Sequence, residues 1–461
     1  MSTAKPAGNN RGAVTFPNTQ GLRCGLALIV TVLVLLSTVA TTSAQQTWTL
    51  DAAIRYALDH NPEARIAGDR IAVARALLGQ AKAAFLPSLQ LSSSYTRTDN
   101  PTMVFGAILN QQAFSNNLDF NDVPEVDNAR ITGMVSLPLY AGGAHLAGRR
   151  AANAGTAAAQ VDAEAVRNHL AFEVARTFYT VPKTRELIRA AEAGVRAFEN
   201  NLRVAHNRLT SGTALKTDVL DVEVRLARAR EELVRAQNAR ALTLRALRNL
   251  LSTDENEIVV ADTEVEPRIP PTDDFTKRPE LAAATKRFEA AQALLRAAKS
   301  GYLPQVNAFG SVDHDHGWEF DNGAWSYTAG VTMQWNLWDG NRTRTRVEQA
   351  RAEVETAREQ KRRVYLAVDL EVEQERIRVN EASQRFSVTE KAVAQATESA
   401  ALTRSRFEQG LAISSQLIDA EAALTTARVR RAEALADRRI AVAALRAALG
   451  LPQRSGTQAN L

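Results

Sequence analysis

The sequence contains an internal duplication, and this constrains the fold more than any other feature of the chain. The stretch LLGQAKAAFLP at 77–87 returns as LLRAAKSGYLP at 294–304, an offset of 217 residues. Further along the chain the offset is 198, as it is between Asp221 and Asp419. Several matches at two self-consistent offsets are the signature of a repeated structural unit. The two copies are predicted to occupy 45–262 and 263–461.

A secretory signal peptide is expected at 1–44. An apolar run at 25–36 follows a segment whose only charged residues are basic, and small residues at 42–44 suit a signal peptidase. This run is too short to cross a bilayer about 30 Å thick as a helix. The chain after it has no apolar run of transmembrane-helix length. A mature chain that enters a membrane is therefore expected to do so as β-strands.

Composition argues against several classes of function. The one cysteine, Cys24, lies in the expected signal peptide, so the exported chain has no disulfide, cysteine-ligated zinc or catalytic cysteine. The net charge of +5 comes without a basic patch interleaved with aromatic residues, which argues against a nucleic-acid partner. The chain also has no phosphate-binding glycine loop, nucleophile elbow or zinc-protease motif. We expect neither an enzyme nor a cofactor.

Each copy contains two segments in which apolar and polar side chains alternate with a period of two. In the clearest of them, Tyr327, Val331 and Trp335 fall on one face and polar or small residues on the other. Such segments of about ten residues are what a membrane β-barrel requires. Taken singly, each also fits a half-buried strand of a soluble sheet. The predicted strand pairs are 86–98 with 129–140, and 303–312 with 326–338.

The remaining stretches are predicted to be helices. Residues 143–210 and 341–409 contain almost no Gly or Pro, and each can form a helix about 100 Å long. Pro182 should kink the first of them. Shorter helices are expected at 50–85 and 277–302. Apolar residues with 3-4-3 spacing indicate heptad packing between helices. They include Val195, Phe198, Leu202, Ala205, Val219, Val222, Leu226, Leu417 and Leu424.

Four strands cannot close a barrel, because the smallest membrane barrels have eight. An open sheet edge cannot face lipid, since its backbone groups would lack hydrogen-bond partners. The chain should therefore oligomerise, and three copies would supply twelve strands.

These features together resemble the TolC-like outer-membrane efflux family over 45–452. The resemblance rests on the duplicated order of helix, two strands and two helices, and on paired motifs at equivalent places. These motifs are Phe85-Leu86-Pro87 and Tyr302-Leu303-Pro304, Leu139-Tyr140-Ala141-Gly142-Gly143 and Leu337-Trp338-Asp339-Gly340, and Arg208-Leu209-Thr210-Ser211-Gly212 and Arg406-Phe407-Glu408-Gln409-Gly410.

The resemblance implies a mixed α+β membrane protein: a long α-helical coiled-coil barrel joined to a transmembrane β-barrel that a homotrimer completes. It also implies an outer membrane location in a Gram-negative bacterium, with contacts to outer membrane lipid and a long periplasmic portion. Such a protein is the passive exit duct of a tripartite efflux or type I secretion system. Its partners are an inner-membrane pump and a periplasmic adaptor.

The family further implies where the duct narrows at its periplasmic entrance. A ring of aspartates lies on the helix after the second inter-helix glycine, and Asp419 matches one of these positions while Gln416 stands at the other. The family clamps the closed entrance with an arginine two residues after that glycine, where this chain has Ala412. The acidic partner of that clamp is retained as Asp218, and Lys216 is an alternative cation.

A second interpretation of these acidic residues remains open. Asp218, Asp221 and Asp419 lie in or near first helical turns, where negative charge favours the helix dipole. The pore-constriction candidates are thus Asp419, Gln416, Asp218 and Asp221. The turns themselves, with Gly212, Thr213, Gly410 and Leu411, are expected to form the tip that meets the adaptor.

Residues 96–129 and 313–325 are expected to be extracellular loops. The second contains Asp313-His314-Asp315-His316, for which a solvated polar loop is the main interpretation and a metal site the alternative. Other classes of function are a periplasmic adaptor, a structural coiled-coil protein of the envelope, or an exported enzyme without a recognisable catalytic motif. The sequence does not separate drugs, metals, small molecules and proteins as exported substrates.

Overall fold

The structure is a computed structural model that describes residues 47–119, 122–254, 258–261, 266–409 and 411–453. The expected signal peptide at 1–44 and the turn residue Gly410 lie outside the described residues. The chain divides into Met1–Thr47 and Trp48–Leu461, and the long helices and the four-stranded sheet all belong to the second unit.

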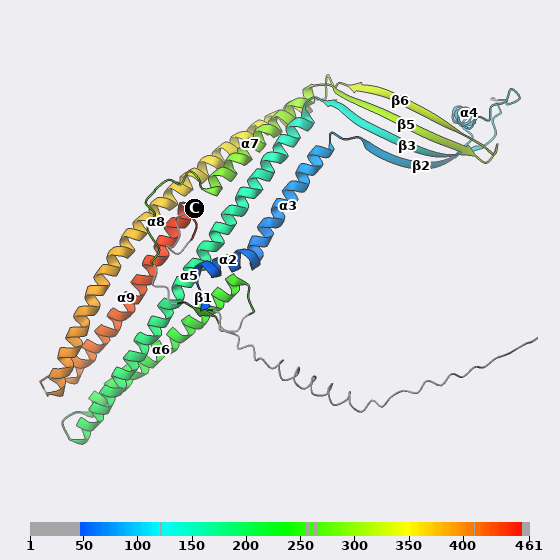
Figure 1. The fold of residues 1–461 in the computed structure, drawn as a ribbon. Coiled ribbons are helices and arrows are strands. Elements are labelled where there is room, and N and C mark those ends of the chain that lie inside the picture. The colour runs from blue at the N-terminus through cyan, green and yellow to red at the C-terminus, as the bar shows by residue number, and fades with distance from the viewer. Residues whose placement is uncertain (1–46, 120–121, 255–257, 262–265, 410, 454–461) are drawn as a thin grey trace, which may run out of the picture. The chain divides into compact units, whose positions relative to one another are not determined.

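Each half of the chain runs from helix through two strands to two long helices (Figure 1). The first half consists of α2 (Leu50–His60), α3 (Pro62–Ala83), β2 (Ser88–Thr98), α4 (Pro101–Asn110), β3 (Val126–Ala141), α5 (Ala144–Thr210) and α6 (Lys216–Leu251). The second consists of α7 (Pro279–Lys299), the 3₁₀ turn η1 (Ser300–Tyr302), β5 (Gln305–Gly317), β6 (Asn322–Gln334), α8 (Arg342–Glu408) and α9 (Ser414–Ala448). The predicted α+β fold with an internal duplication is confirmed.

The prediction of a single helix at 50–85 is wrong, because Asn61 separates two helices, α2 and α3. Asn61 has an extended backbone, with φ −68° and ψ 134°, as a residue before proline prefers. Its side-chain amide donates to the backbone oxygen of Leu250, at the end of α6, at 2.9 Å. At the equivalent place in the second repeat, Arg278 donates to the backbone oxygen of Ala448 at 3.0 Å. In each repeat the residue before the short helix thus joins its start to the end of the last long helix.

The four long strands form one antiparallel sheet in the order β2-β3-β5-β6. Residues that pair across it share a face, so the register defines the two surfaces. One row is Ser92, Thr132, Asp313 and Ser326, and the next is Leu91, Gly133, Val312 and Tyr327. One face is therefore polar and the other apolar. Leu91 is 77% exposed and Tyr327 83% exposed, so the apolar face lies open in the single chain.

The expected loop at 313–325 is wrong. β5 continues to Gly317 and β6 begins at Asn322, so only 318–321 connect them. Charged residues fit this strand because alternate side chains leave on opposite faces. Asp315 is 1% exposed on the polar face, whereas His314 and His316 lie on the other, with ring centroids 4.6 and 5.1 Å from Trp325 and Trp318. In the described ranges no three His, Cys, Asp or Glu side chains are grouped to hold a metal.

The expected loop at 96–129 is shorter than predicted and contains a helix. β2 runs to Thr98 and β3 begins at Val126, and α4 lies between them. Asn100 starts this helix, because its side-chain oxygen accepts from the backbone nitrogens of Thr102 and Met103 at 3.1 and 3.3 Å. Pro101 then suits the first helical position.

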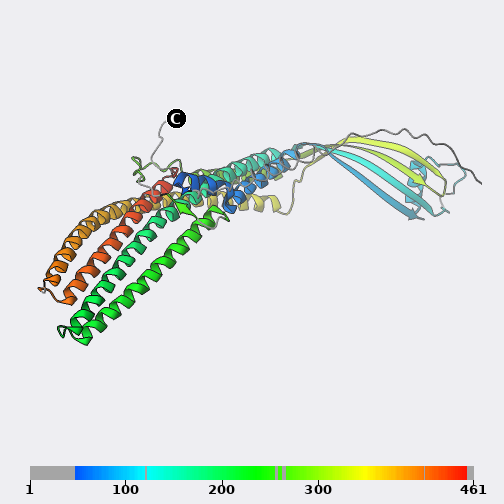
Figure 2. The same cartoon turned by 60° about the horizontal axis from the view of Figure 1, so that its bottom comes forward.

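The hairpins α5/α6 and α8/α9 run side by side away from the sheet (Figure 2). α5 and α8 have 67 residues each, and α5 continues through Pro182, whose kink stays a prediction. Two short strands, β1 (Thr47–Trp48) and β4 (Val259–Val260), pair with each other. The largest apolar core lies where Trp48, α2, β4, α5 and α6 meet. None of the helices in the described part of the chain is long and apolar enough to cross a bilayer.

Candidate functional site

The turn between α5 and α6 closes with a Schellman motif centred on Gly212. Gly212 has φ +74°, which L side chains rarely adopt. The backbone nitrogens of Gly212 and Thr213 donate to the oxygens of Leu209 and Arg208 at 3.1 and 2.8 Å. A Cβ at Gly212 would meet no atom within 4 Å, so the backbone conformation alone selects glycine there.

The turn between α8 and α9 repeats this arrangement in its described residues. The backbone nitrogen of Leu411 donates to the backbone oxygen of Arg406 at 2.8 Å. The backbone nitrogen of Thr213 makes the same hydrogen bond to the backbone oxygen of Arg208 in the first turn. Gly410, the counterpart of Gly212, lies outside the described residues.

Asp218 and Gln416 occupy equivalent positions and make equivalent capping hydrogen bonds. The carboxylate of Asp218 accepts from the backbone nitrogen of Leu215 at 3.0 Å, and the side-chain oxygen of Gln416 accepts from that of Ile413 at 3.3 Å. Each side chain satisfies a backbone donor at a helix start that has no other helical partner. This favours the first-turn interpretation of Asp218.

Asp419 and Asp221 occupy equivalent positions of the two repeats, but Asp419 lies beside a basic side chain of the other hairpin. The Asp419 side chain is 72% exposed and lies 3.8 Å from Arg225 of α6. An ion pair this exposed contributes about 0–1 kcal/mol. It therefore leaves the Asp419 carboxylate available to solvent. Asp221 is exposed on α6, one helical turn after Asp218.

Arg208 joins the two turns, a role that its sequence motif did not indicate. Its Nη2 donates to the backbone oxygen of Phe407 at 3.3 Å, and its guanidinium carbon lies 4.0 Å from the centroid of the Phe407 ring. A cation at the C-terminus of α8 also suits the helix dipole. Arg208 of the first repeat thus reaches the turn of the second, while the clamp role of Lys216, the alternative cation, stays a prediction. Ala412 supplies no polar group.

The two hairpins also share an apolar core near the turns. Ile418 of α9 packs with Ala205 of α5 and with Val219 and Val222 of α6, all at most 5% exposed. Phe198, Leu202 and Leu209 border this cluster. The heptad positions predicted for 195–226 are therefore confirmed as a helix–helix seam, and the second hairpin contributes to it.

Three aliphatic side chains stand exposed at the turns. Leu215 is 70%, Leu411 74% and Ile413 63% exposed. Leu215 and Ile413 immediately precede α6 and α9, at equivalent positions of the two repeats. Sequence reasoning missed both, although an apolar residue just before a helix, inside a polar turn, is a readable signal. We call Thr213, Leu215, Leu411 and Ile413 together the tip patch.

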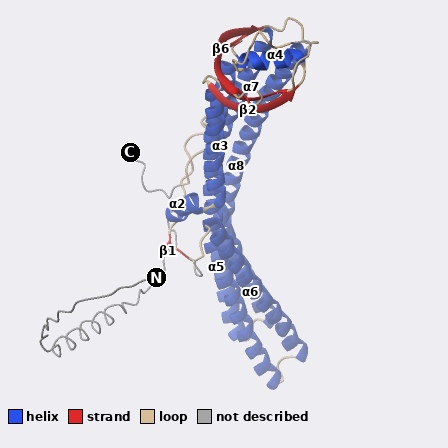
Figure 3. Cartoon of the chain, turned by 90° about the vertical axis from the view of Figure 1, so that its right-hand side faces the viewer, coloured by secondary structure: helices blue, strands red, loops and turns tan. Residues whose placement is uncertain are grey.

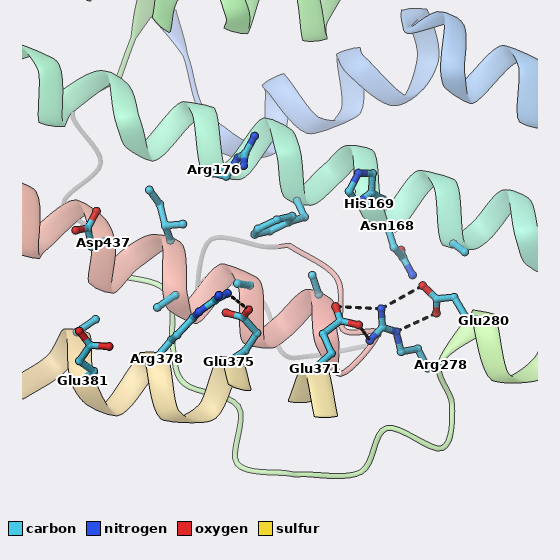
Figure 4. Close-up of a pocket in the computed structure, with 18 of the residues that line it drawn as sticks. Asn168, His169, Arg176, Arg278, Glu280, Glu371, Glu375, Arg378, Glu381 and Asp437 are labelled. Carbon is cyan, nitrogen blue, oxygen red and sulfur yellow. Dashed lines mark hydrogen bonds and ion pairs between the residues drawn. The ribbon is translucent and has the colours of Figure 1, made fainter. Parts of the chain in front are cut away.

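A cavity of about 510 Å³ lies farther along the helices, between α5, α8 and α9 (Figure 4). Arg278 closes one end of it through hydrogen bonds to Glu280 at 2.9 Å and Glu371 at 2.6 Å. Burial lowers the pKa of Arg278, but the bonds to these two carboxylates outweigh it and raise the pKa overall. With its hydrogen bond to the backbone oxygen of Ala448, Arg278 thus joins α7, α8 and α9. We assign these charges to helix packing at this junction.

Comparisons with known proteins agree with this architecture. The family model described as Outer membrane efflux protein matches residues 53–253 and 275–451, one segment in each repeat. Protein CyaE of Bordetella pertussis is 27% identical over 318 residues, which are 66% of this chain and 63% of that protein. The chain therefore spans less than two thirds of the length of this relative.

Two solved structures have the same fold. A membrane protein from Pseudomonas aeruginosa has a TM-score of 0.76 and 20% identity, covering 87% of this chain and 93% of that one. The outer membrane protein VceC of Vibrio cholerae has a TM-score of 0.73 and 21% identity, covering 87% and 96%. Since the family model matches most of both repeats, the chain belongs to the outer membrane efflux protein family.

Proposed function

We propose that three copies of this chain assemble into an outer membrane duct, through which substrates leave the cell passively. The observation that carries this proposal is the two-faced sheet with two free edges. β2 and β6 are the outer strands, and within the described residues each pairs on one side only. Joining β6 of one copy to β2 of the next would close twelve strands and leave no free edge.

Aromatic residues at both ends of the apolar face support a membrane setting. Trp335 and Tyr140 are 54% and 46% exposed at the end nearest the helices, and Trp325 and Tyr95 are 69% and 60% exposed toward the other end. Membrane barrels carry such aromatic girdles at both interfaces, with an apolar band between them. The polar face, with rows such as Ser92, Thr132, Asp313 and Ser326, would then line the water-filled interior.

The long hairpins would form the periplasmic part of the duct. α5 and α8, at 67 residues each, extend about 100 Å from the strands. The turns at their far ends would form the entrance, with Asp419 as a three-fold ring of carboxylates. Energy would come from an inner-membrane pump that acts through a periplasmic adaptor.

The tip patch is the proposed adaptor contact, with Gly212, Thr213, Gly410 and Leu411 as the turn residues. Leu215, Leu411 and Ile413 offer apolar side chains that a partner can cover. Tripartite efflux and type I secretion both use such a duct. The family description favours efflux, while the exported substrate stays open. A periplasmic adaptor is the alternative, and the exposed apolar face of the sheet argues against it.

Membrane topology tests the proposal directly. No cysteine occurs in 45–461, so single cysteines can be introduced in exposed positions, with Asn116→Cys between β2 and β3 and Thr213→Cys at the tip patch. A membrane-impermeant maleimide should label Asn116→Cys on intact cells. It should label Thr213→Cys only after the outer membrane is permeabilised. Labelling of Thr213→Cys alone on intact cells would contradict the proposed orientation.

A further inference from the structure

Helix α4 lies against the polar face of the sheet, at the end away from the long helices. Figure 3 shows it on the concave side of the curved strands. Gln111, which follows α4 directly, contacts Asn128 and Gly317, and both belong to the polar face. The other hairpin has no counterpart, since only 318–321 connect β5 to β6. α4 is thus a feature of the first repeat alone.

Gln111 anchors α4 to the sheet. Its side chain is fully buried, and its Nε2 donates to the backbone oxygen of Asp127 at 2.8 Å and to the side-chain oxygen of Asn128 at 3.0 Å. Asn128 in turn donates to Asp315 at 2.6 Å. A Cβ on Gly317 would lie 2.3 Å from the side-chain oxygen of Gln111, so only glycine leaves room for this anchor.

Apolar packing fixes the buried side of α4 and leaves its other sides open. Val104 and Ile108 are fully buried against Val126. Met103 and Leu109 are 52% and 46% exposed, and at 100° per residue each lies about 120° around the helix from that contact, on opposite sides of it. If the polar face lines the duct, these two side chains border the side of α4 that faces its axis.

The space inside a twelve-stranded barrel limits where three copies of α4 can lie. Twelve strands about 4.8 Å apart and tilted by about 40° enclose a barrel about 24 Å in diameter. Three helices of about 10 Å diameter packed around one axis need about 22 Å. Three copies of α4 would therefore nearly fill such a barrel, which brings their exposed sides close together.

We propose that α4 is an exit gate, in which the exposed sides of three α4 helices meet on the axis and close the outer end of the duct. The inference rests on the proposed trimer. The occupant of the exposed face is the same helix of the other two copies. The end of α4 lies beside the edge strand that would join the next subunit, since Asn322 at the start of β6 donates to the backbone oxygen of Gln112 of the same chain at 3.1 Å. Apolar constrictions of this kind stop flow by dewetting.

Cross-linking tests the contact. Detergent-purified Leu109→Cys protein, treated with a short bis-maleimide, should give a two-chain band on denaturing gels. Asn116→Cys, exposed outside α4, is the matched control and should give none. The mass of the same sample in mild detergent distinguishes failure of the proposed trimer from failure of the proposed gate. A single chain overturns the trimer and the gate together, whereas three chains without a Leu109→Cys cross-link overturn the gate alone.

Conductance in planar bilayers tests the function of the gate. Met103→Glu should raise single-channel conductance about two-fold or more, because a charged side chain rewets an apolar constriction. Gly317→Ala should act in the same direction by displacing Gln111. Gly310→Ala in the same strand is its control, since a Cβ there would meet no atom closer than 3.9 Å. Unchanged conductance in both Met103→Glu and Gly317→Ala trimers would overturn the gate.

Discussion

Arg208 of the first repeat lies over the ring of Phe407 of the second, with the guanidinium carbon 4.0 Å from the ring centroid and Nη2 3.3 Å from the backbone oxygen. The two helix turns of one chain are therefore joined at the end where we place the entrance. Any widening that separates the two hairpins has to break this contact.

Replacing Arg208 by alanine should favour the open entrance. A cation–π contact at an exposed site is worth about 0.5–1 kcal/mol, so the ratio of open to closed channels should rise about two- to five-fold. Arg406→Ala, at the equivalent position of the second turn, is the matched control. Single-channel recording measures the open probability. Equal open probability in the Arg208→Ala and Arg406→Ala channels would remove this contact from gating.

Asp419→Ala should weaken cation selectivity and block by polyvalent cations added from the periplasmic side. Three carboxylates near one axis attract cations, and their loss removes that field. Asp221→Ala should matter less. Arg225→Ala should strengthen cation preference, because Arg225 lies 3.8 Å from Asp419 and offsets its charge. Identical selectivity and block in wild type and Asp419→Ala would take Asp419 out of the pore and leave only its effect on the helix.

Gly212→Val should impair export while trimers still form. A β-branched residue forced to φ +74° costs about 1–2 kcal/mol, which would reshape the turn and the tip patch. Gly212→Asn is the control, since asparagine tolerates this conformation. Export of the pump's substrate is the readout, together with trimer mass. If the Gly212→Val protein exports as well as wild type, adaptor docking does not depend on this turn.

Glu375 gives a prediction for pH dependence. Burial raises the pKa of this carboxyl, although the nearby Arg378 opposes the shift. A raised pKa means that ionisation costs the folded state stability, so the penalty is absent in acid and appears as the pH rises through the folded pKa. Glu375→Gln should therefore raise the melting temperature at about pH 8, and the gain should vanish near pH 4.

The exposed Glu359→Gln on the same helix is the control for Glu375 and should show no such trend. Thermal unfolding in detergent across this pH range measures both variants. A Glu375→Gln gain that does not change with pH would show that the carboxyl is not destabilised by burial.

The elements with strong local signals could be predicted from the sequence. Period-two alternation located the four strands, and the turn around Gly212 follows from glycine at a helix end. Two local signals were misread. The stretch Asp313–His316 consists only of polar residues, and such a run is typical of a loop. In the strand the two aspartates lie on one face and the two histidines on the other. Asn100-Pro101 is a helix-start signal inside the expected loop at 96–129, and it marks the start of α4.

Other features depend on contacts that no local pattern contains. Arg208 meets Phe407 across 199 residues of sequence, and Arg278 meets Ala448 across 170. Arg208 is one of many arginines in α5, and Arg278 stands just before α7, so nothing in their sequence neighbours indicates these partners. The cap of Asp218 was readable as an acid in a first helical turn, but the exposed ion pair of Asp419 with Arg225 arises only when the two hairpins pack.

The number of chains in the assembled particle tests the central claim most directly. Native mass spectrometry of the protein released from mild detergent counts the chains. The two free edges of the sheet predict three chains and no smaller stable species. A stable single chain in aqueous buffer without detergent would contradict the closed duct, because one copy has only four strands and an exposed apolar face.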